Sequence, residues 1–189
     1  MSALKYRALL FSLATAALAV LAGCPLAGGK GEEKQAQAAK AKMEQNIQAG
    51  YTASMDIQYQ DIEATAVIDQ SSPGDYVITF QSPEAMNGME FATKGEKITL
   101  SYRGLSASFT TDDFFNSAIA KQLIRTMNAV TSKEGLSLSM EEQALLIEGA
   151  LDTGDFTLKI DRENGNFLHL SIPSEGLEVN FTNFQLLSR

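Results

Sequence analysis

The residue with the most evident chemistry is Cys24, the only cysteine of the 189-residue chain, which ends the sequence Leu-Ala-Gly-Cys. Its sulfur is a nucleophile once it is deprotonated, so it can be modified covalently. Lys5 and Arg7 precede an apolar run at residues 8–21, which is too short for a stable membrane span and is typical of a secretory signal. The small residues directly before Cys24 suit the pocket of a peptidase.

Residues 21–24 resemble the lipobox of bacterial lipoproteins. The resemblance implies transfer of a diacylglyceryl group to the Cys24 sulfur, cleavage before Cys24, and often acylation of the new amino group by a chain such as palmitate. We therefore predict a lipoprotein signal peptide at residues 1–23 and a lipidated cysteine with a flexible tether at residues 24–31. Two or three acyl chains hold a protein on a membrane far more firmly than one chain does. The alternative is an ordinary signal peptide whose cysteine is incidental.

The charge balance limits the partners of the predicted mature chain. Removing residues 1–23 takes away Lys5 and Arg7, so the formal net charge falls from −8 to −10. Such a surface repels polyanions, and the sequence has no cluster of Lys and Arg of the kind that binds phosphates, so we expect no nucleic-acid partner. A chain with one cysteine forms no intramolecular disulfide. The expected location is extracytoplasmic, with N-terminal lipid on Cys24 anchoring the protein to the bacterial cell membrane.

The sequence offers little for catalysis. His169 is the only histidine and lies in an alternating segment, where a solvent-facing position in a sheet is the simpler interpretation. The motifs G-x-S-x-G, H-E-x-x-H and the P-loop do not occur. Asp112 and Asp113 suit the start of a helix, and the acidic residues between 152 and 163 do not have the spacing of a calcium loop. We therefore predict a protein that is not an enzyme, with no metal site and no cofactor.

The predicted domain covers residues 32–189 and begins with a helix. Residues 32–48 are rich in Ala, Gln, Lys and Glu, which are strong helix formers, and Ala39, Met43 and Ile47 recur at every fourth position. This pattern indicates a thin amphipathic helix that ends at Gly50. It is compatible both with packing on the domain and with a spacer.

From residue 51 onward, apolar residues alternate with polar ones, which is the period of a strand with one solvated face. The short intervals between these segments require antiparallel hairpins, because parallel strands would need crossovers of about a dozen residues or more. The segments that we predict as strands are residues 51–59, 62–68, 76–80, 98–102, 105–109, 136–140, 144–151, 156–160, 168–172 and 177–181.

One strong helix interrupts the strands. Thr110 and Asp113 have the spacing of a capping box. Apolar residues then recur at every fourth position, at Phe115, Ile119, Leu123 and Met127. This helix is expected to face the sheet.

The predicted fold class is α+β, a curled antiparallel sheet or incomplete β-barrel closed by one main helix plus the N-terminal helix. Strands spaced about 4.8 Å apart give a sheet roughly 40–45 Å wide, whereas one helix covers only about 10–12 Å. The uncovered apolar face must curl around the helix or remain a concave surface suited to a lipid or acyl chain. The candidate cavity residues are Ile57, Tyr59, Ala66, Phe80, Ile98, Leu100, Tyr102, Phe115, Ile119, Leu123 and Met127. The alternative is a core that side chains and the N-terminal helix fill completely.

Four fragments, at residues 80–89, 102–105, 161–168 and 176–184, resemble LolA-like envelope proteins of the lipoprotein-carrier superfamily. The resemblance spans residues 50–187 and is closest to small membrane-anchored members of Gram-positive bacteria, related to germination and envelope lipoproteins. It implies a LolA-like half-barrel with an apolar cavity, which in carrier members holds lipoprotein acyl chains. Periplasmic carriers are soluble shuttles, whereas this chain has a predicted lipid anchor of its own.

Two functions from different classes follow from these expectations. The first is a membrane-anchored lipoprotein, non-catalytic, that binds a lipid or acyl chain in its concave cavity. The second is an interaction module that docks an envelope protein partner such as a cell-wall enzyme. Bound lipid in the purified protein favours the first function, and an empty cavity with a co-purifying protein favours the second.

Overall fold

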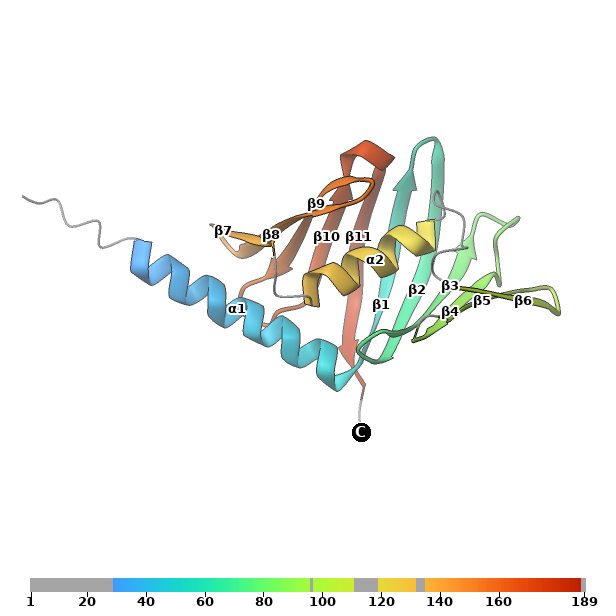
Figure 1. The fold of residues 1–189 in the computed structure, drawn as a ribbon, viewed down its shortest axis with the longest axis horizontal. Helices are drawn as coiled ribbons and strands as arrows, with labels where there is room; N and C mark the ends of the chain where they lie inside the picture. Colours follow the sequence, from blue (N-terminus) through green and yellow to red (C-terminus); the bar gives the residue numbers. More distant parts are fainter. Residues whose placement is uncertain (1–28, 96, 111–118, 132–134, 188–189) are drawn as a thin grey trace, which may run out of the picture.

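The computed structural model describes residues 29–95, 97–110, 119–131 and 135–187. They form one antiparallel sheet of eleven strands, ordered β6-β5-β4-β3-β2-β1-β11-β10-β9-β8-β7, with helices α1 and α2 in front of it in the view of Figure 1. The sheet is curled but not closed, because β6 and β7 each have only one neighbouring strand among the described residues. The predicted fold class, an open antiparallel sheet with a main and an N-terminal helix, is confirmed by this arrangement.

The chain builds the sheet from two successive meanders. The first contains β1 (Tyr51–Tyr59), β2 (Ile62–Ser72), β3 (Asp75–Ser82), β4 (Glu90–Lys94), β5 (Lys97–Tyr102) and β6 (Leu105–Thr110). The second contains β7 (Ser137–Glu141), β8 (Ala144–Leu151), β9 (Gly154–Asp161), β10 (Phe167–Ile172) and β11 (Leu177–Leu186), with a short 3₁₀ turn, η1 (Pro173–Glu175), before β11.

The two meanders join where the first strand pairs with the last. On β1, Met55 lies opposite Ala66 of β2 and Phe181 of β11, and all three side chains are buried. The alternation that predicted these strands therefore places one apolar row across the middle of the sheet. The core lies between this row and the two helices.

Helix α2 (Ile119–Thr131) lies over the middle of the sheet, and α1 (Gly29–Ala49) contacts β2 and the strands β7, β8 and β9. On α1, Ala39, Met43 and Ile47 are buried at the spacing that the sequence shows. Of the two alternatives that the sequence left open, α1 therefore packs on the domain and is not a spacer. The amide of Gly50 then donates to the Asn46 carbonyl at 3.0 Å and closes the helix.

The sequence analysis missed one strand, β4. Its segment carries a threonine at an inward position, which hides the alternation of apolar residues. Thr93 is 6% exposed, and its hydroxyl accepts from the Tyr76 amide at 2.9 Å and donates to the Gly74 carbonyl at 2.9 Å. These two hydrogen bonds satisfy the polar group inside the sheet.

The β9–β10 turn is fastened to α1. Asn46 donates from its amide nitrogen to the Asn164 carbonyl at 2.9 Å, and Lys42 donates to the Glu163 carbonyl. Gly165 has a φ of +75°, and a Cβ there would meet the backbone of Met43. Glycine is therefore required both by the left-handed conformation and by the close approach of the helix.

Candidate ligand cavity

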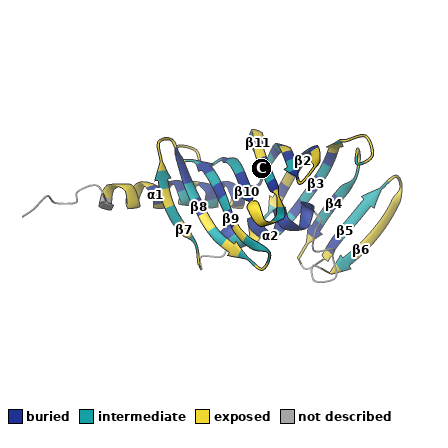
Figure 2. Ribbon diagram, turned by 90° about the horizontal axis from the view of Figure 1, so that it is seen from above, coloured by how far each residue is buried: buried dark blue, intermediate teal, exposed yellow. Residues whose placement is uncertain are grey.

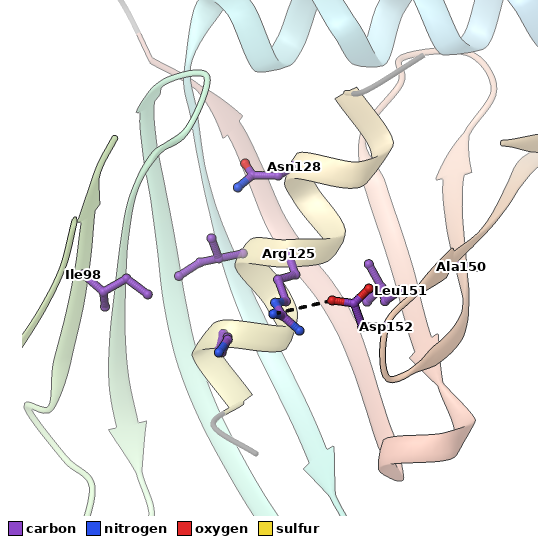
Figure 3. A pocket seen from close by; sticks show the side chains of 8 residues that line it. Ile98, Arg125, Asn128, Ala150, Leu151 and Asp152 are labelled. Carbon is purple, nitrogen blue, oxygen red and sulfur yellow. Dashed lines mark ion pairs between the residues drawn. The ribbon is translucent and has the colours of Figure 1, made fainter. Parts of the chain in front are cut away.

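A cavity of about 350 Å³ opens beside α2, between β5 on one side and the β8–β9 hairpin on the other (Figure 3). Its volume is at the lower end of the range in which proteins hold small ligands, about 300–1,000 Å³. The lining residues are Ile98 from β5, Lys121, Ile124, Arg125 and Asn128 from α2, and Ala150, Leu151 and Asp152 from the β8–β9 hairpin. The two halves of the sheet and the central helix thus meet around one space.

The apolar part of the lining comes from all three elements. Ile98 and Ile124 are 1% and 4% exposed, and Leu151 is half-buried. Leu151 packs against the hydrophobic core without being part of its fully buried set. An apolar group in the cavity would therefore contact side chains that continue into the core.

The polar part comes mainly from one side of α2. Lys121, Arg125 and Asn128 follow one another at steps of four and three residues, which places them in a row along the helix. Lys121 is 2% exposed, whereas the Arg125 side chain is 31% exposed and Asn128 is exposed. The Arg125 Nη2 and Asp152 Oδ2 atoms form an ion pair at 3.8 Å.

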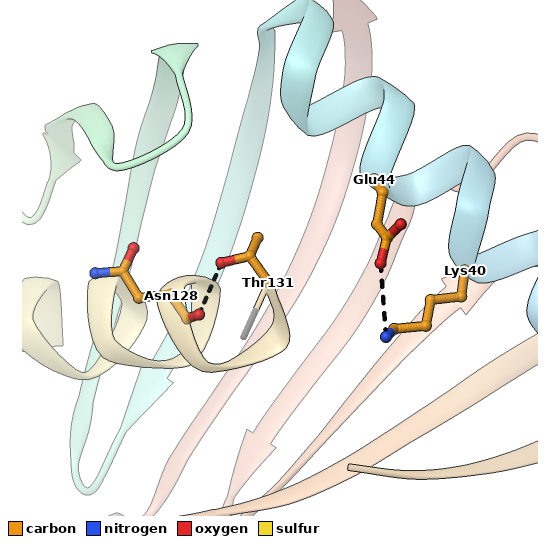
Figure 4. A network of polar contacts seen from close by, with 4 residues as sticks. All are labelled: Lys40, Glu44, Asn128 and Thr131. Atoms are coloured by element: carbon orange, nitrogen blue, oxygen red, sulfur yellow. Dashed lines mark hydrogen bonds and ion pairs between the residues drawn. The ribbon is translucent and has the colours of Figure 1, made fainter. Parts of the chain in front are cut away.

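Hydrogen bonds hold the cavity walls in place. Thr153 donates to the Gln122 side-chain oxygen at 3.3 Å, which ties the β8–β9 turn to α2. The Thr131 hydroxyl donates to the Asn128 carbonyl at 2.7 Å in the last turn of α2, as Figure 4 shows, with the Lys40–Glu44 ion pair of α1 in the same view. The two cavity walls formed by α2 and the β8–β9 hairpin are therefore attached to one another.

Tyr76 borders the polar row from β3, and its hydroxyl is 3.5 Å from the Asn128 side-chain oxygen. Burial raises the pKa of Tyr76 to about 12, against a smaller lowering by a hydrogen bond with the backbone of Gly74. Burial also raises the pKa of Tyr51 well above its usual value, with a further increase from Tyr76. Both phenols are therefore neutral near pH 7 and contribute no anion to this region.

The sequence-predicted cavity residues fall into distinct places. Ile98 is the one that the cavity lining and the prediction share. Seven others are buried in the core, at Ile57, Tyr59, Ala66, Phe80, Ile119, Leu123 and Met127. Leu100 and Tyr102 are half-buried on β5, where the Tyr102 hydroxyl donates to the Ala85 carbonyl at 2.6 Å. Phe115 and Cys24 lie outside the described residues.

Sequence reasoning did not select the polar row of the cavity. The available signal was the pair of cations Lys121 and Arg125, four residues apart beside the apolar stripe of a helix. Their position opposite Asp152 depends on how the β8–β9 hairpin approaches α2, and no local pattern encodes that approach.

Two of the other polar residues singled out in the sequence, His169 and Asp161, have structural roles, whereas Asp112 and Asp113, at the predicted helix start, lie outside the described residues. His169 on β10 pairs with Glu178 on β11 at 2.9 Å. The Asp161 carboxylate accepts from the backbone amides of Glu163 and Asn164 at 2.7 and 3.0 Å and so shapes the β9–β10 turn. Within the described residues, no group of three or more His, Cys, Asp or Glu side chains could hold a metal ion. Neither α1 nor α2 has the length and apolar content that crossing a membrane requires.

No protein-family model matches the sequence, and no curated protein matches it. Among solved structures, the chain is similar to an uncharacterised conserved protein from Thermus thermophilus, with a TM-score of 0.54 and 12% sequence identity over 82% of this chain and 88% of that chain. At that identity, the similarity shows a shared fold alone.

Two further solved structures are similar at lower TM-scores. One is a LolA superfamily protein from Nitrosomonas europaea, with a TM-score of 0.43 and 8% identity over 82% of this chain and 94% of that chain. The other is one chain in the structure of the CwlD amidase from Clostridioides difficile in complex with the GerS lipoprotein, with a TM-score of 0.47 and 11% identity over 78% of this chain and 92% of that chain.

Proposed function

We propose that this protein is a membrane-anchored bacterial lipoprotein, of the small Gram-positive LolA-like type, that binds a lipid or acyl chain and has no catalytic role. The observation that carries the proposal is the cavity beside α2, which combines an apolar floor with a polar side. Such a lining suits a ligand that is apolar along most of its length and polar at one end.

The size of the cavity limits the ligand. A volume of about 350 Å³ equals the liquid volume of roughly a dozen water molecules. A methylene group takes up about as much room as a water molecule, so the cavity accommodates much of one acyl chain. Two chains side by side would not fit without movement of α2 or the β8–β9 hairpin.

The tether is consistent with presentation of the ligand at a membrane surface. Residues 31–35 of α1 are exposed, and Ala36 is the first buried residue among those of the helix whose side chains are described. The start of α1 therefore projects from the body of the domain, as Figure 2 shows. A lipid on Cys24 would hold the domain near the bilayer while leaving the cavity several turns of helix away.

Native mass spectrometry of protein purified gently from the membranes of its host tests the anchor and the ligand together. We expect a covalent mass increase on Cys24 and a second, non-covalent mass in the range of a single-chain lipid. An unmodified Cys24 would contradict the anchor, and a protein that carries no lipid and binds no fatty acid would contradict the ligand.

A cavity-filling substitution links the ligand to the site. Leu151 is half-buried on the inner face of β8 and lines the cavity, so Leu151→Trp fills part of it with a larger apolar side chain without enlarging a fully buried residue. We expect the affinity for a fluorescent fatty acid to fall at least about tenfold, which corresponds to about 1.4 kcal/mol. The matched control, Ala38→Trp on the exposed side of α1, should bind as the unmodified protein does. Equal binding by both variants would place the ligand elsewhere.

The second candidate function is docking of an envelope protein partner such as a cell-wall enzyme. The observation that favours it is β6, whose residues are exposed except for the half-buried Phe109 and which carries no charged side chain. An uncharged strand at the edge of a sheet can pair with a strand of another protein. A stable co-purifying protein together with an empty cavity would support this function over lipid binding.

A further inference from the structure

The charges around the cavity are unevenly distributed. Its lining contains two cations, Lys121 and Arg125, and one carboxylate, Asp152. The whole chain has a formal net charge of −8, so this lining has the opposite sign to the protein as a whole. The positive charge of the lining attracts anions to the cavity. The acidic remainder of the protein repels them.

Arg125 is the cation with capacity for a further partner. Its ion pair with Asp152 is 3.8 Å long, which exceeds the length of a hydrogen bond. A guanidinium carries five N–H donors in a planar fork that matches the two oxygens of a carboxylate or phosphate. The pair with Asp152 therefore leaves the fork able to bind an anion that enters the cavity.

Asp152 is positioned to give way to such an anion. Its side chain is 91% exposed, and an exposed ion pair contributes little to stability. The aspartate can turn into solvent at small cost when another oxyanion approaches Arg125. In the absence of a ligand, it partly neutralises the guanidinium at the cavity mouth.

The polar and apolar parts of the lining are adjacent. Ile124 directly precedes Arg125 on α2, while Leu151 directly precedes Asp152 on the hairpin. Each wall thus carries an apolar side chain next to a charged one, as the close-up in Figure 3 shows for Leu151 and Asp152. A ligand with a chain and a charged head can satisfy both at once, whereas a small ion would leave the apolar side chains uncovered.

We propose that the ligand of this cavity is a single-chain amphiphile with an anionic oxygen head group, carboxylate or phosphate, which pairs with Arg125 while the chain lies against Ile98, Ile124 and Leu151. The inference rests on the proposed lipid-binding function and adds the chemical class of the head group. Fatty acids and lysophospholipids both have this chemistry.

Isothermal titration of the purified full chain with four probes tests the inference. The probes are palmitate, palmitoyl-lysophosphatidylglycerol, the neutral ester 1-palmitoylglycerol, and inorganic phosphate as a head group without a chain. We expect at least one of the two anionic amphiphiles to bind about tenfold or more tightly than the neutral ester, because the ester has no charged head group to form charge-assisted hydrogen bonds with Arg125. The stronger of the two identifies the head group, and phosphate alone should bind weakly.

Two variants connect this preference to Arg125. Arg125→Gln keeps most of the side-chain length and removes the charge, so the anionic and neutral probes should bind it with similar affinity. Asp152→Asn removes the competing carboxylate at a solvated position, so it should strengthen binding of the anionic probes by a fewfold and leave the neutral probe unchanged. If Arg125→Gln kept the full preference for the anionic probes, or if Asp152→Asn weakened their binding, the assignment of Arg125 would be overturned.

The outcomes separate this inference from the proposed function. Equal binding of the neutral and anionic amphiphiles by the unmodified protein would refute the head-group assignment and leave lipid binding in place. Failure of every amphiphile to bind would refute both. Phosphate binding as tight as that of the amphiphiles would show an anion site without a role for the chain.

Discussion

The two ends of the sheet are built alike and covered differently. Each end is an antiparallel hairpin, β5–β6 at one end and β7–β8 at the other. On β8, Leu145 and Ile147 are fully buried, whereas on β6 Leu105 is 79% exposed. Figure 2 shows the same contrast as buried colour along β8 and exposed colour along β6.

The difference follows from α1. This helix contacts β7, β8 and β9 and supplies the apolar side chains that cover their inner face, but among the described residues it has no comparable contact with β5 or β6. A strand pattern therefore determines which face of a hairpin is apolar, and a helix elsewhere in the sequence determines whether that face is buried. The cavity lies at the boundary, with one wall from each end of the sheet.

The strongest test of this comparison places the same charge at each end. Met43 is fully buried on the inner side of α1, so Met43→Asp would bury an unpaired carboxylate and should lower the free energy of unfolding by several kcal/mol. Hydrogen exchange should rise in β7–β9, which would then resemble β5–β6. The measurements are thermal unfolding and amide exchange.

The matched variant is Leu105→Asp at the open end, where the side chain is 79% exposed. Its free energy of unfolding should change by less than about 0.5 kcal/mol. A large loss of stability in this variant would mean that the β5–β6 hairpin is covered in solution, and the contrast between the two ends would be wrong.

A smaller effect is expected from two turn glycines, one in the β9–β10 turn that contacts α1 and one in the hairpin at the open end. Gly165→Ala introduces a Cβ at a φ of +75° and against the backbone of Met43, so it should cost about 3 kcal/mol and loosen α1. Gly104→Ala, in the β5–β6 turn at a φ of +80°, meets nothing within 4 Å and should cost only about 1–2 kcal/mol of backbone strain. Equal shifts in melting temperature would show that α1 does not press on the β9–β10 turn.

Much of the fold could be predicted from the sequence because it is encoded locally. Alternation and turn residues located ten strands, and the spacing of Ala39, Met43 and Ile47 indicated the face of α1. The strand β4 was missed because Thr93 occupies an inward position and meets its hydrogen-bonding needs through Tyr76 and Gly74, a solution that only the folded sheet reveals.

The candidate site was less predictable because it depends on distant segments. Ile98 was selected as part of an apolar strand, whereas Arg125 and Asp152 are brought together by the approach of a hairpin to a helix. Periodicity identified which residues are apolar, but it did not distinguish side chains in a filled core from those beside a void. Phe80 and Ile98 belong to the same alternating pattern, and of the two Ile98 lines the cavity.

The finest test of the comparison enlarges one side chain in each environment. Ala66 is 1% exposed in the middle of the sheet, so Ala66→Leu should overpack the core and cost about 1–3 kcal/mol. Leu100 on β5 is half-buried toward the open end, so Leu100→Phe has room to expand and should leave the melting temperature nearly unchanged. Thermal unfolding of both variants measures the difference directly. If Leu100→Phe were as destabilising as Ala66→Leu, the β5 side of the molecule would be a filled core, and an acyl chain in the cavity would have to lie along Ile124 and Leu151 alone.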